Sequence, residues 1–96
     1  MYASIRKGKI KPGTVIAEVV PLINSGAMPI LSSISGFKAA YVVHSDDDTF
    51  TAISIFADRA AADQSNALIL DWLRQNLGPL LAGPPEVTVG EVVVHK

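Results

Sequence analysis

The sequence predicts an α+β domain of the ferredoxin-like type, in which two helices pack on one face of a four-stranded antiparallel sheet. The expected elements follow one another in the order β-α-β-β-α-β, which is the pattern of this fold. A β-hairpin with an acidic turn at Asp46–Asp48 lies at its centre. The length of 96 residues suits one domain, so residues 1–96 are expected to form a single unit.

The first strand and the first helical region come before the hairpin. Residues 2–10 favour an extended strand, and Lys-Pro-Gly at 11–13 ends it, because proline fixes φ and glycine supplies the turn. Two adjoining apolar stripes follow at helical spacing, with Thr14 as the expected N-cap. Pro21 should bend this helix, and Pro29 should restart a shorter helical piece.

The central hairpin, expected at residues 37–44 and 49–56, is apolar on both faces. Residues 39–43 form an unbroken apolar run, whereas a sheet with one face in water alternates polar and apolar side chains. The helices cover only one face, and the whole chain is 49% hydrophobic and only 18% charged. We therefore expect a second copy of the chain to cover the other face, giving a homodimer through its sheets.

Glycines and an aspartate mark the remaining boundaries. Gly36 is expected as a left-handed cap that ends the first helical region. Asp58 is the expected N-cap of the second helix, which is the clearest helix in the chain and ends at Gly78. The last strand is expected over residues 86–96, with a bulge or a close backbone approach at Gly90.

Charge and composition exclude several classes of function. The net charge is −1, and the only basic cluster, at residues 6–11, has no aromatic platform beside it, so nucleic-acid binding is not expected. The apolar segment that follows is interrupted by Glu18 and Asn24 and broken by prolines, so no membrane span is expected. The chain contains no cysteine, which excludes disulfides and thiolate metal sites. We expect a soluble, cytoplasmic protein.

Three short motifs carry a resemblance to a known family. They are Lys-Pro-Gly at 11–13 after the first strand, Gly-Phe at 36–37 before the second, and Asp-Arg-Ala at 58–60 after a strand that ends in an aromatic residue. With them, the chain resembles the antibiotic-biosynthesis-monooxygenase-like members of the dimeric α/β-barrel superfamily over almost its whole length. The resemblance implies that two protomers' sheets form a barrel and that each protomer has a cleft between sheet and helices.

The superfamily includes cofactor-free quinone-forming monooxygenases, haem-degrading enzymes, isomerases and many members of unknown activity. Its haem-degrading branch uses an asparagine from strand one, with a tryptophan and a histidine from the second helical region. Here Arg6 lies near the asparagine position, Ser65 or Asn66 stands where the tryptophan would be, and the second helix has no histidine. Neither haem nor any other cofactor is therefore expected.

Polar residues on apolar faces are the candidate site. Asn66 interrupts the apolar face of the second helix, and Ser54 lies between apolar residues on one strand face. Because a buried amide or hydroxyl costs about 1–3 kcal/mol when unpaired, each should bond to backbone or face a cavity. In a ligand pocket of about 300 Å³ or more, Tyr41 and Trp72 would be aromatic walls and Arg6 would pair with an anionic or enolate oxygen. The alternatives are that both aromatic residues belong to the core or an interface and that Arg6 forms an ion pair at the surface or the dimer interface.

The remaining titratable residues predict no metal site. His44 lies beside the acidic turn, where it could act as an acid or base but is more simply a solvated turn residue. His95 lies next to the C-terminus, and two such distant histidines give no metal-ligand spacing. The run Asp46–Asp48 lacks the spaced oxygen ligands and the glycine of a calcium loop.

The resemblance implies a cofactor-independent monooxygenase. Its apolar pocket would hold a small aromatic or polyketide-like substrate that itself activates oxygen. Asn66 and Arg6 would orient the substrate or bind an oxyanion, and Ser54 would donate or accept a hydrogen bond in the pocket. The alternative is a non-catalytic dimeric module that binds a small molecule or serves assembly, and the residues leave open whether the protein is an enzyme.

Overall fold

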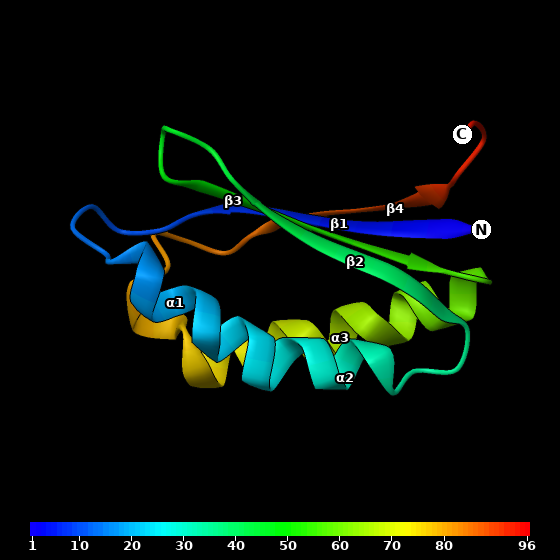
Figure 1. Ribbon diagram of the computed structural model, residues 1–96, viewed down its shortest axis with the longest axis horizontal. Helices are drawn as coiled ribbons and strands as arrows, with labels where there is room; N and C mark the ends of the chain where they lie inside the picture. Colours follow the sequence, from blue (N-terminus) through cyan, green and yellow to red (C-terminus); the bar gives the residue numbers. More distant parts are fainter.

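A computed structural model describes residues 1–96 as one antiparallel sheet with helices on one of its faces (Figure 1). The strand order is β2-β3-β1-β4, so β1 lies between two neighbours. The strands are β1 (Tyr2–Lys9), β2 (Phe37–His44), β3 (Thr49–Phe56) and β4 (Glu86–Glu91). This arrangement confirms the predicted ferredoxin-like α+β fold.

The helical layer consists of two rods. The first is continuous through α1 (Ile16–Leu22), the π-helical turn η1 (Ile23–Ala27) and α2 (Met28–Ser32). The second is α3 (Arg59–Asn76), followed by the short 3₁₀ turn η2 (Gly78–Leu80). Figure 1 shows both rods on the same side of the sheet, which leaves the other side open. None of these helices combines the length and the apolarity that crossing a lipid bilayer requires.

The first rod differs from the predicted helix at its start and at Pro29. The Thr14 hydroxyl donates to the carbonyl of Lys11 at 2.7 Å, and Val15 is the N-cap without a side-chain bond, so the predicted cap is wrong. At Pro29 the predicted shorter helical piece is confirmed as α2, but an unpredicted π turn joins it to α1 without a break, with the Met28 N–H bonded to the Ile23 carbonyl. A wider turn suits a proline, which has no N–H and crowds the carbonyl four residues back.

The hairpin and the start of the second helix agree with the sequence prediction. Strands β2 and β3 have the predicted bounds, and Gly36 has the left-handed φ of 91°. The Asp58 carboxylate accepts a hydrogen bond from the Ala61 N–H at 2.8 Å and caps α3.

Strand β4 is shorter and more regular than predicted. It ends at Glu91, which pairs with Tyr2, the first residue of β1. Gly90 pairs in register with Ala3 and nothing lies within 4 Å of its missing Cβ, so the predicted bulge there is wrong. The irregularity of the sheet lies instead on β2, between Phe37 and Ala39.

The core fills the space between the sheet and both rods. Its buried residues are Ala27, Leu31, Ile34, Phe56, Ala61, Ala62 and Ile69. The open face of the sheet is apolar too, because the register places Ile5, Ile53 and Tyr41 side by side on it. Tyr41 is 59% exposed and Val43 is 48% exposed in the single chain.

Candidate functional site

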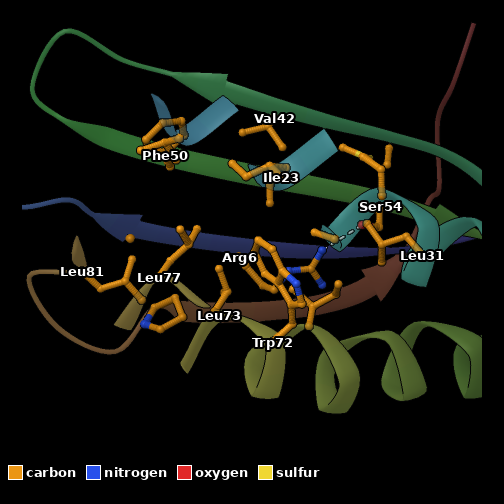
Figure 2. A pocket seen from close by; sticks show the side chains of 18 of the residues that line it. Arg6, Ile23, Leu31, Val42, Phe50, Ser54, Trp72, Leu73, Leu77 and Leu81 are labelled. Carbon is orange, nitrogen blue, oxygen red and sulfur yellow. Dashed lines mark hydrogen bonds between the residues drawn. The ribbon is translucent and has the colours of Figure 1, made fainter. Parts of the chain in front are cut away.

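The centre of the candidate site is the guanidinium group of Arg6, on the helix-facing side of β1. Only 3% of Arg6 is exposed. Its Nη1 donates to Ser4 Oγ at 3.0 Å and to Asn66 Oδ1 at 2.8 Å, and its Nη2 donates to Ser54 Oγ at 2.8 Å. Figure 2 shows Arg6 and Ser54 joined by a hydrogen bond at the edge of a pocket.

Strand pairing and helix periodicity bring these partners together. Ser4 stands two residues before Arg6, so both point to the same face, and Ser4 is the register partner of Ser54 on β3. Asn66 reaches them from α3, where it lies between the buried residues Ala62 and Ile69 on one helix face. The Ser4 hydroxyl also donates to Asn66 Oδ1 at 2.5 Å, so this amide oxygen accepts two bonds.

The charge of Arg6 has no counter-ion. Four ion pairs occur in the chain, and none of them includes Arg6. Burial disfavours the charged form and lowers the pKa of Arg6 from its ordinary value to about 10, which still leaves the side chain cationic at neutral pH. Its buried Nε–H has no hydrogen-bond partner at all. An uncompensated buried cation opposes folding by several kcal/mol, in order of magnitude.

Arg6 lies on the wall of an apolar cavity of about 80 Å³ between the sheet and the helical rods. Of its 21 lining residues 17 are hydrophobic, and Arg6 is the only charged residue among them. Figure 2 shows Phe50 and Val42 on the sheet side and Trp72 and Leu73 on the side of α3. A small apolar ligand with one anionic or strongly accepting group is the chemistry that fits such a lining.

The structure brings together three of the predicted site residues at the cavity. Arg6, Ser54 and Trp72 line it. Asn66 does not line it and contacts Arg6 instead. Tyr41 borders the cavity, but its register partner is Ile53 and its side chain is largely exposed, which assigns it to the open face of the sheet.

Two site residues were missed from the sequence. Ser4 bonds both Arg6 and Asn66, and Phe50 supplies an aromatic wall where Tyr41 was expected. Period-two alternation could have found both, because Ser4 shares a face with Arg6, and Phe50 shares one with Ser54. The unbroken apolar run of the hairpin concealed which face each residue takes.

The site matches neither of the two outcomes that the sequence suggested. Ser54 and Asn66 bond to a buried cation rather than to backbone, yet the cavity is much smaller than the roughly 300 Å³ typical of ligand pockets. A second hollow, of about 230 Å³, lies between α1, η1 and β2. It shares four lining residues with the cavity, namely Ile23, Met28, Val42 and Phe50, so a larger ligand could extend from one into the other.

The position of Trp72 depends on Gly26 in the π turn. A Cβ atom built on Gly26 would lie 2.4 Å from Cζ2 and 2.5 Å from Nε1 of Trp72, closer than any real contact. The indole therefore lies directly against the glycine backbone. Glycine at this position lets α3 and η1 approach each other while Trp72 forms a wall of the cavity.

Comparisons with solved structures agree with the fold. A protein of unknown function from Nitrosomonas europaea is 27% identical, with a TM-score of 0.81, covering 99% of this chain and 91% of that one. An antibiotic biosynthesis monooxygenase is 22% identical, with a TM-score of 0.74 and coverage of 98% and 100%. A monooxygenase of Streptomyces coelicolor, solved with nanaomycin D, is 18% identical, with a TM-score of 0.69 and coverage of 98% and 92%. No protein-family model and no curated sequence matched the chain.

We predict that Gly26→Ala displaces Trp72 and destabilises the domain. Overpacking of this kind typically costs about 1–3 kcal/mol, although alanine is the better helix former by about 1 kcal/mol. Trp72 is the only tryptophan, so its fluorescence reports the displacement directly, and urea unfolding measures the loss. Gly83→Ala, at a site with nothing within 4 Å, is the matched control. An unchanged spectrum with increased stability would contradict the proposed packing.

Proposed function

We propose that this protein, which has the fold of the antibiotic biosynthesis monooxygenases, is a cofactor-independent monooxygenase. Its substrate is a small aromatic or polyketide-like molecule that binds in the cavity beside Arg6. The observation that carries the proposal is the buried guanidinium, which has only neutral partners and a free Nε–H inside an apolar space. A cation without a structural counter-ion is explained by a ligand that supplies the negative charge.

The proposed reaction oxidises an activated ring methylene to a ketone, as R₂CH₂ + O₂ → R₂C=O + H₂O. The substrate loses a C–H proton, and its carbanion forms a C–O bond with oxygen. The O–O bond of the resulting hydroperoxide then breaks, so one oxygen atom stays in the carbonyl and the other leaves as water with both hydrogens. All four electrons come from the substrate, so the protein needs only to position it, exclude water and stabilise negative charge.

Each residue of the site has a distinct role in this proposal. Arg6 binds the negative end of the substrate, in surroundings whose low dielectric strengthens the interaction. Asn66 and Ser4 are positioning residues, because they hold Nη1 and thereby fix the plane of the guanidinium. Ser54 holds Nη2 and lines the cavity, and Trp72 is a wall against which the ring lies.

Oxygen uptake tests the enzyme proposal. With anthrone-type and quinol substrates, Arg6→Met should lower turnover by about 100-fold or more, the usual effect of removing a group that stabilises developing charge. Asn66→Ala should lower it less, because Arg6 keeps its bonds to both serines. Arg74→Met, on the exposed side of α3, is the matched control and should be as active as the natural chain. No turnover with any substrate, or equal turnover in all variants, would refute the proposal.

We also propose that the chain forms a homodimer through the open face of its sheet. The support is the row of apolar side chains there, including the largely exposed Tyr41 and Val43. A stable interface buries about 800 Å² per partner, and at roughly 25 cal/mol per Å² its apolar part rivals the net stability of a small domain before association costs are subtracted. A partner on this face would also explain why the hairpin strands are apolar on both sides.

Sedimentation tests the dimer. At micromolar concentration the natural chain should have twice the protomer mass of 10.1 kDa, and Ile53→Asp should shift it to a monomer, because the aspartate would have to be buried unpaired. Leu68→Asp, an exposed apolar position on α3, is the control and should leave the mass unchanged. A natural chain that sediments as a monomer would exclude this assembly.

The alternative function is a non-catalytic dimeric module that binds a small molecule or serves assembly. The observation in its favour is the cavity volume of about 80 Å³, which is too small for a three-ring substrate without movement of the wall. Ligand binding without oxygen uptake in the experiments above would favour this function over the monooxygenase.

A further inference from the structure

Two N–H groups of Arg6 have no hydrogen-bond partner within the protein. A guanidinium has five N–H groups, and the bonds to Ser4, Asn66 and Ser54 use three of them. Of the remaining two, one is the Nε–H, which is buried without a partner, and the other is the second N–H of Nη2. Nη2 lies on the side of the guanidinium away from Cδ, to which the Nε–H also points, so Nε and Nη2 are neighbouring donors.

The surroundings leave the positive charge uncompensated. All three partners of Arg6 are neutral, two hydroxyls and an amide oxygen, and no acidic side chain lines the cavity. The carboxylates that form ion pairs do so with other residues at the exposed surface, as Asp47 does with Lys9. A neutral ligand would satisfy the Nε–H but would leave this charge unpaired, whereas an anion would satisfy both requirements.

We propose that the ligand of this cavity is an aromatic carboxylate, held by Arg6 through two parallel hydrogen bonds from Nε–H and Nη2–H. This inference rests on the ligand-binding part of the proposed function and names its substrate class. The spacing of two neighbouring guanidinium donors matches the two oxygens of a carboxylate, which is why arginine is preferred for this group. The carboxylate thus orients the molecule, and oxidation takes place at a carbon of its ring system.

The size of the cavity favours a planar acid over other anions. A phosphate group is larger, carries up to two charges and would need more donors than the two that Arg6 has left. The apolar side chains of Phe50 and Trp72 provide surfaces for a flat ring. The space of about 80 Å³ is smaller than the roughly 150 Å³ of a cavity that binds benzene, so an aromatic acid would extend past Ile23 into the adjoining hollow.

Binding of a matched pair of probes tests the inference. Benzoate and benzamide have nearly the same shape, but only benzoate is charged at neutral pH. We expect benzoate to bind at least 10-fold more tightly in an NMR titration and to move the Arg6 Nε–H resonance downfield, since that proton gains a charged acceptor. Equal affinities, no binding of either probe at millimolar concentration, or an Nε–H resonance that stays in place would each overturn the inference.

Two arginine variants test the two-donor geometry. Arg6→Lys keeps the positive charge but removes the pair of adjacent N–H donors. Its affinity for benzoate should therefore fall at least 10-fold, while its affinity for benzamide changes little. Arg74→Lys on the exposed side of α3 is the control and should bind as the natural chain does. Undiminished benzoate binding by Arg6→Lys would overturn the bidentate arrangement. The comparison of the two probes in the natural chain needs no variant, so it holds even if Arg6→Lys fails to fold.

The outcome separates this inference from the proposed activity. Selective benzoate binding by a protein that consumes no oxygen would refute the monooxygenase and support the carboxylate site. Oxygen uptake with uncharged substrates, by a protein that binds benzoate no better than benzamide, would overturn the carboxylate site and support the monooxygenase.

Discussion

The structure is organised around one constraint, which is the burial of a cation in the middle of the sheet. Arg6 lies on a strand with neighbours on both sides and under the helical layer, so water cannot solvate it. Ser4 and Ser54 from paired strands and Asn66 from α3 provide the only oxygens within reach. An apolar side chain of similar length would fill the same space without the desolvation penalty. The folded chain tolerates this desolvation penalty, and ligand binding would explain why a cation is buried at this position.

The helical layer completes the site through backbone geometry rather than polar groups. The π turn before Pro29 brings Gly26 against Trp72, and this contact sets where the indole stands. The wall at Trp72 therefore depends on a wide turn and on a glycine that leaves room for the indole. This links the local effect of a proline to the volume of the cavity and hence to the size of the molecule that it accepts.

Local signals in the sequence predicted most of the fold, and non-local pairing decided the rest. The hairpin and the Asp58 cap depend on neighbouring residues, so pattern alone was enough. The end of β4 depends on the length of β1, and the orientation of Tyr41 depends on the register of an apolar run without alternation. Arg6 was predicted to pair with an anionic oxygen, and Ser4 on the same strand could have been found by alternation, but its contacts with Ser54 and Asn66 could not be foreseen, because these residues come from distant segments.

The central claim is that Arg6 serves a ligand rather than the fold, and the stability of a double variant tests it most directly. Arg6→Met with Ser54→Ala removes the buried charge and its partner hydroxyl together, so neither group is left unpaired. Urea unfolding at fixed protomer concentration should give a free energy equal to that of the natural chain or higher by up to about 2 kcal/mol. A loss of about 3 kcal/mol or more would show that the cation holds the fold together, and would contradict this account.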